Sequence, residues 1–418
     1  MAVCTAQVVG VALALCALAA PSSAWAADPL GGKVRVSGFA NLTGAGLPAE
    51  RDESGGGLFS EIGVQVTPQW KTDRRIVVAA RATFGGTGQL DGFGDAWAGS
   101  VGELSFFVIG PFGRIEIGER AGFPQTLLGY APAEVAFANS EYSPESGTRL
   151  SPNGRLATAF LSPALAGRIN SITYLGYAAR YYDSASPKII YVSPRKRGFY
   201  AALSYAPRSV KSTGLALSAA GDRGERTAPL SPPGSASEFR DLVQAAFVWQ
   251  RRSENLDLTL GTTFSHAREE IPGASLGRRT VSSISSGATA IVRDTWELGL
   301  SATYDGFSEA VAGAVGGADP FGVVASLNWI GGSFFVGGYY QYASAPAPVG
   351  AFERDRVHVA QLGGAYLIPS AHDWLGEDFY TDLKIYADVT YTRFADGTRP
   401  GWQRGDVVLL VGARFSFY

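Results

Sequence analysis

The chain has 418 residues, of which 17% are charged, and its formal net charge is −2. Soluble domains carry about 25% charged residues, and a nearly neutral chain has no electrostatic basis for binding nucleic acid. The 53 glycines, 23 phenylalanines, 18 tyrosines and 8 tryptophans are typical of a β-rich membrane protein. The two cysteines, Cys4 and Cys16, both lie near the N-terminus, so disulfides and thiolate sites are excluded from the rest of the chain.

The N-terminus predicts an export signal. Residues 8–20 form a short apolar run, and Ala24, Trp25 and Ala26 follow it as a cleavage site with small residues. A run of this length is too short to span a bilayer. We therefore expect a signal peptide over residues 1–26 and one domain over residues 27–418.

Several segments alternate between polar and apolar residues. In residues 33–42, Lys33 and Arg35 share one face while Val34 and Val36 share the other. Residues 75–84 and 383–392 alternate in the same way. Each segment is about ten residues long, which is the length of a tilted strand that crosses a bilayer. The alternation predicts transmembrane β-strands with one polar and one apolar face.

The connections between these segments alternate in length. Seven connections are short, at residues 71–73, 110–113, 195–197, 251–254, 293–294, 331–332 and 371–378. Eight are long and rich in Pro, Gly and Ser, at residues 44–57, 86–94, 120–187, 207–238, 266–279, 306–319, 344–354 and 395–405. Bacterial barrels have short periplasmic turns and longer external loops. We therefore predict an all-β fold, a 16-stranded antiparallel transmembrane β-barrel with an aqueous lumen.

Two alternatives bear on this count. Residues 171–177 also alternate and could add a further strand. A soluble β-sandwich or propeller could show the same alternation, but its strands are mostly five or six residues long, and no internal repeat of a propeller blade is present. The C-terminal segment, residues 406–418, is apolar and ends in aromatic residues. It is expected to close the barrel against the first strand, which leaves no open edge in the membrane.

Three segments resemble one known family. Residues 188–207, Lys-Ile-Ile-Tyr-Val-Ser-Pro-Arg-Lys-Arg-Gly-Phe-Tyr-Ala-Ala-Leu-Ser-Tyr-Ala-Pro, are similar to a strand-turn-strand signature of Gram-negative general diffusion porins, especially those of Alphaproteobacteria. Residues 112–118 and 34–40 resemble two further strands of that family. The resemblance implies a homotrimer of 16-stranded barrels in the cell outer membrane. It also implies a third external loop that folds inward to narrow each pore, and residues 120–187 are in the right order to be that loop.

The candidate site is the constriction of such a pore. Charged rings select ions, and opposed rows of acids and bases create a field across a channel. The basic candidates on the predicted strands are Arg35, Arg75, Arg81 and Arg114. The acidic candidates in the expected third loop are Glu134, Glu141 and Glu145. Alternation indicates that Arg35 and Arg81 face the lumen, although their height in the pore is not given by it. The loop glutamates could equally be solvated extracellular charges.

The predicted function is passive diffusion of ions and small hydrophilic solutes through a water-filled outer-membrane channel. Alternatives are a substrate-selective channel for an anion or a sugar and a structural or adhesive barrel with a plugged lumen. No enzyme is predicted, because the three histidines are scattered without a Ser or Asp arrangement. No cofactor is expected; the acidic segments 50–53 and 376–378 could hold Ca²⁺ but offer few ligands. The expected partners are further copies of the chain, outer-membrane lipid and lipopolysaccharide.

Overall fold

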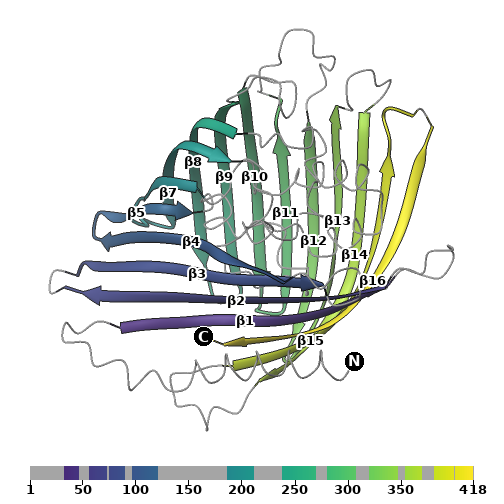
Figure 1. The fold of residues 1–418 in the computed structure, drawn as a ribbon, viewed down its shortest axis with the longest axis horizontal. Coiled ribbons are helices and arrows are strands. Elements are labelled where there is room, and N and C mark those ends of the chain that lie inside the picture. The colour runs from purple at the N-terminus through teal and green to yellow at the C-terminus, as the bar shows by residue number, and fades with distance from the viewer. Residues whose placement is uncertain are drawn as a thin grey trace.

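The computed structural model describes residues 33–46, 56–72, 75–89, 97–120, 186–210, 238–269, 280–306, 320–346, 354–369, 381–399 and 401–417. These residues form sixteen antiparallel strands that close into one barrel (Figure 1). The strands are β1 (Lys33–Gly46), β2 (Gly56–Lys71), β3 (Val77–Gln89), β4 (Trp97–Gly110), β5 (Gly113–Arg120), β6 (Ser186–Val192), β7 (Phe199–Val210), β8 (Glu238–Arg252), β9 (Leu256–Glu269), β10 (Thr280–Val292), β11 (Trp296–Tyr304), β12 (Phe321–Gly331), β13 (Phe334–Pro346), β14 (Arg354–Pro369), β15 (Thr381–Ala395) and β16 (Gln403–Phe417). The predicted fold class and strand number are confirmed.

The barrel closes between its first and last strands. β1 and β16 pair antiparallel from Gly38 opposite Phe417 to Gly46 opposite Leu409. This pairing satisfies the backbone groups of both strands, as a barrel in lipid requires. The expected role of the C-terminal strand is therefore confirmed.

Short and long connections alternate around the barrel. Two residues, Pro111 and Phe112, join β4 to β5, and Gly332 and Ser333 join β12 to β13. The next connection after β5 covers 121–185, which includes residues 171–177 and lies outside the described residues. Because short turns are periplasmic in bacterial barrels, the short-turn end of this barrel faces the periplasm.

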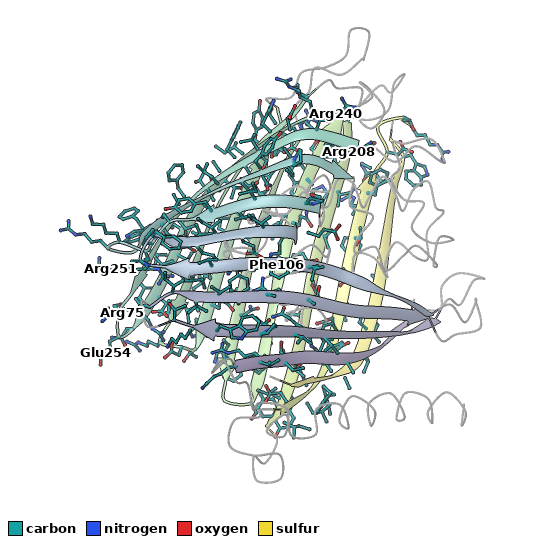
Figure 2. The ribbon with its side chains drawn as sticks, turned by 60° about the vertical axis from the view of Figure 1, so that its left-hand side comes forward. Arg75, Phe106, Arg208, Arg240, Arg251 and Glu254 are labelled. Carbon is teal, nitrogen blue, oxygen red and sulfur yellow. The ribbon has the colours of Figure 1, made fainter. Side chains whose placement is uncertain are left out.

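The two faces of each strand differ in polarity. In β12, Val323, Leu327 and Trp329 are exposed, whereas Ser326 and Asn328 are buried on the opposite face. The exposed positions include large apolar side chains on most strands, such as Phe106, which is 63% exposed (Figure 2). An apolar outer face and a polar inner face are those of a barrel that stands in lipid and encloses water. Among the described residues there is no helix long and apolar enough to cross a membrane.

Candidate functional site

A row of inward-facing residues runs from strand to strand across six neighbouring strands. Strand pairing places Arg35 opposite Thr67, and Arg81 opposite Ser105. The β2–β3 pairs on either side, Val66 with Ala82 and Gln69 with Ala79, put Thr67 opposite Arg81. The row continues on β5 and β6, where Ser105 lies opposite Gly118 and Gly118 opposite Lys188. Three cations, Arg35, Arg81 and Lys188, therefore belong to one row of paired positions on the lumen wall.

The carboxylate of Glu116 lies beside this row and forms ion pairs with three arginines. Its Oε2 atom lies 2.6 Å from Nη2 of Arg114, and its Oε1 atom lies 2.8 Å from Nε of Arg120. The Nη1 atom of Arg81 is 3.7 Å from Oε1, and the hydroxyl of Ser105 donates a hydrogen bond of 2.6 Å to the same oxygen. The side chain of Glu116 is only 3% exposed. Among the described residues, one carboxylate thus lies among three guanidinium groups, which gives this part of the wall a net positive charge.

An aromatic ring supports two of these guanidinium groups. Phe107 lies opposite Glu116 in the β4–β5 pairing. The guanidinium carbon of Arg114 is 4.3 Å from the centre of its ring, and that of Arg81 is 5.2 Å away. The negative face of an aromatic ring attracts a cation at this distance. Phe107 therefore helps to fix where the positive charge lies.

The end of β5 is also held in place. The Nζ atom of Lys188 donates a hydrogen bond of 2.9 Å to the backbone carbonyl of Arg120, the last residue of β5. At Gly118 the backbone has φ +149°, and a Cβ atom there would lie 2.3 Å from the carbonyl oxygen of Leu104. Only glycine fits this close approach. The cluster is therefore built on a wall that is fixed by both backbone and side-chain contacts.

The predicted site residues are distributed as follows. Arg81 and Arg114 meet at Glu116, and Arg35 lies in the same row but forms no ion pair within the described part of the chain. Arg75 lies in the β2–β3 turn at the short-turn end, with φ 60° and an exposed side chain. Glu134, Glu141 and Glu145 lie outside the described residues, as do the acidic segments 50–53 and 376–378. Membership of a constriction remains a prediction for all seven candidates.

Sequence reasoning missed Glu116, Arg120 and Lys188. The signal was present, because Arg114, Glu116, Gly118 and Arg120 alternate with Ile115, Ile117 and Glu119 along β5. Ile115 and Ile117 are 42% and 55% exposed, as expected of the lipid-facing side. The same parity argument that placed Arg81 inside would have placed Glu116 and Arg120 inside as well.

Other inward-facing charges line the rest of the wall. The carboxylates of Asp355 and Asp388 are buried on β14 and β15, and Lys384 and Arg414 lie opposite each other on β15 and β16. The guanidinium carbon of Arg414 is 4.3 Å from the centre of the Phe39 ring on β1. The lumen wall therefore carries both signs of charge, with the largest described group of cations around Glu116.

A closed antiparallel barrel with an apolar outer face and charged groups along its inner wall belongs to the class of transmembrane β-barrel channels. The chain belongs to the Gram-negative porin family, because the sequence profile of that family matches residues 12–376. It is accordingly a diffusion channel of the outer membrane. The resemblance seen in the sequence is confirmed at the level of the family.

The solved structures that match the chain include porins from one bacterium. A triple mutant of the Rhodopseudomonas blastica porin is 14% identical, with a TM-score of 0.45, and the match covers 92% of this chain and 100% of that chain. A double mutant of the Rh. blastica porin matches with the same identity, coverage and TM-score. No curated protein sequence matches the chain significantly.

Proposed function

We propose that this porin is a general diffusion pore for ions and small hydrophilic solutes. The observation that carries the proposal is the inner wall, where Arg81, Arg114 and Arg120 surround the single carboxylate of Glu116. Fixed charges of this kind set ion preference without binding one solute tightly. Arg35 and Lys188, at the two ends of the row that contains Arg81, add positive charge to this side of the lumen wall.

The proposal includes an acidic row that faces these cations. Glu134, Glu141 and Glu145 of the long β5–β6 connection are its proposed members, by resemblance to the family. Opposed acids and bases would orient polar solutes as they pass. Replacing Glu141 with Gln should then lower cation preference, whereas replacing Arg81 should raise it. If neither substitution moves the reversal potential in a salt gradient, the two residues do not line the narrow point.

Planar-bilayer recording of the purified full-length protein tests the main proposal. We expect unitary conductance that rises nearly linearly with salt concentration and no saturable block across a panel of sugars, organic anions and amino acids. Saturable block by one solute would favour a substrate-selective channel. Absence of conductance would favour a barrel whose lumen is plugged.

We further propose that the chain works as a homotrimer in contact with outer-membrane lipid and lipopolysaccharide, that residues 1–26 are removed on export, and that it catalyses no reaction. The family resemblance supports the trimer and the signal peptide. Native mass spectrometry of the protein purified from outer membranes tests both at once, because it reports the number of copies and the mass of the mature chain. A monomer that retains residues 1–26 would contradict them.

A further inference from the structure

Three arginines at the short-turn end have an unusual backbone conformation. Arg75, Arg197 and Arg293 have φ values of 60°, 53° and 51°. Among the described residues only five that are not glycine have positive φ, the other two being Asp241 and Asp294. Tight turns of this kind favour Gly and Asn, because a side chain with a Cβ is strained there. A strained residue that persists points to a role other than folding.

Two of these arginines belong to a continuous ledge of three neighbouring turns. The backbone N–H of Gln250 at the end of β8 donates a 2.9 Å hydrogen bond to the carbonyl of Gly198 in the β6–β7 turn. The N–H of Arg293 in the β10–β11 turn donates a 2.9 Å hydrogen bond to the carbonyl of Asn255 in the β8–β9 turn. The turns are thus hydrogen-bonded to their neighbours, and their side chains project from a fixed backbone.

This ledge concentrates positive charge. We use the name basic arc for its six cations, which are Arg195, Lys196, Arg197, Arg251, Arg252 and Arg293. All six are exposed, and the same segments hold three carboxylates, those of Glu254, Asp257 and Asp294. The adjacent turns on either side, residues 111–112 and 332–333, contain no charged residue. Cations gathered in this way repel one another unless an anion lies between them.

Only two of the six side chains of the basic arc have a hydrogen-bond or ion-pair partner among the described residues. Arg195 donates a hydrogen bond to Gln250, and Nε of Arg252 lies 3.2 Å from Oδ2 of Asp257. By contrast, the side chains of the other four, Lys196, Arg197, Arg251 and Arg293, form no hydrogen bond or ion pair within the described residues. Figure 2 shows Arg251 at the same end of the barrel as Arg75 and Glu254. These cationic groups are available to an external anion.

The outer surface beside the basic arc indicates which anion this is. Phe199 is 62% exposed and its ring centre is 6.1 Å from that of Trp249, while Trp296 is 45% exposed. All three occupy outward-facing positions within a few residues of the turns. Aromatic residues at barrel ends sit at the level of lipid headgroups. The cations next to them therefore lie at the level of the headgroup phosphates.

We infer that the basic arc is a binding surface for anionic phospholipid headgroups in the periplasmic leaflet of the outer membrane. On the outward-facing side of β8, Arg251 is the next residue after Trp249 in the direction of the turn. Its side chain therefore lies next to the aromatic residues, where it can contact lipid headgroups. Arg197 and Arg293 present guanidinium groups from the turn tips, and a guanidinium group binds phosphate with two parallel hydrogen bonds. The surface would favour lipids with a net negative charge, such as phosphatidylglycerol, over zwitterionic ones.

The test is lipid selectivity of the whole protein. Wild-type protein is reconstituted in phosphatidylcholine vesicles that contain spin-labelled phosphatidylglycerol or spin-labelled phosphatidylcholine, and the fraction of motionally restricted label gives the relative association constant. We expect wild type to prefer phosphatidylglycerol and to lose the preference in high salt. The combined variant Arg197→Asn, Arg251→Gln and Arg293→Asn should show at least about a two-fold smaller preference. An unchanged preference overturns the inference.

Two controls separate lipid binding from other roles. Arg251→Gln alone should lower the preference, whereas Arg35→Gln, which removes an exposed arginine from the lumen side, should leave it unchanged. Arg197→Asn should keep or raise the thermal unfolding temperature, because Asn tolerates positive φ and precedes Gly198 as in common hairpin turns. A lower unfolding temperature would show that the arginine serves the turn itself. A combined variant that shifts the reversal potential but not the lipid preference would assign the basic arc to permeating anions instead.

Discussion

Arg114 and Glu116 face the lumen from alternate positions of one strand, with Nη2 of the arginine 2.6 Å from Oε2 of the glutamate. The other carboxylate oxygen, Oε1, receives Arg120 at 2.8 Å and the hydroxyl of Ser105 at 2.6 Å. Both oxygens of one acid thus fix basic groups that would otherwise move freely in water. A permeating ion is stabilised more by charges that are held in place than by charges that move. Glu116 therefore acts by holding the surrounding guanidinium groups in place.

Glu116→Gln tests how far the charge of Glu116 offsets the charge of the three arginines and how far it stabilises the barrel. The substitution removes the one negative charge that the described residues contribute to the cluster while keeping its shape, so the anion preference of the pore should rise. Breaking a buried ion pair leaves unpaired charges, and the free energy of unfolding should fall by roughly 3 kcal/mol. Reversal potentials and urea unfolding in detergent micelles measure the two effects. The matched control is Glu119→Gln, an exposed glutamate on the opposite face of the same strand, which should change neither.

Arg81→Gln should raise the cation preference of the pore. A unit charge about 8 Å from a permeating ion contributes about 0.5 kcal/mol in water, which favours chloride and disfavours potassium by equal amounts, so the ratio of chloride to potassium permeability should fall about five-fold. The reversal potential in a potassium chloride gradient measures this ratio. Arg81→Lys keeps the charge and should keep the ratio. Equal shifts in the Gln and Lys variants would show that the geometry of the guanidinium group, rather than its charge, sets the preference.

Alternation in the sequence predicted the inward orientation of Arg81 but could not place it beside Arg114. Parity fixes which face a side chain occupies, because successive residues of a strand point to opposite faces. It carries no information on how far one strand slides along the next, and this register brings Arg81 level with Ser105 and Arg35 level with Thr67. For Arg75 the alternation was misleading, because it placed the residue on a strand. β2 ends at Lys71, and Arg75 lies in the turn that follows.

Gly118→Ala should impair folding of the barrel. A Cβ atom would lie 2.3 Å from the carbonyl oxygen of Leu104, and the backbone has φ +149°. The β4 and β5 backbones would have to separate at the level of the cluster, which costs more than about 1 kcal/mol. Gly332→Ala is the control, because it introduces a Cβ at positive φ without a steric clash: Gly332 has φ +62°, and no atom lies within 4 Å of the position of a Cβ. If both variants fold with the same yield from urea into micelles, the close approach is not limiting.

Phe106→Arg tests which face of β4 meets lipid. Phe106 is 63% exposed and its neighbour Phe107 is 5% exposed, so the two rings occupy opposite faces of one strand. An arginine that faces lipid near the middle of the bilayer costs about 2–4 kcal/mol. The free energy of folding into lipid vesicles should fall by that amount in Phe106→Arg, whereas Phe106→Leu should change it by less than about 1.5 kcal/mol. The conductance of Phe106→Leu should equal that of wild type, because the side chain is outside the lumen. A change in conductance without a change in stability would place Phe106 on the water-filled side and contradict the orientation of the wall.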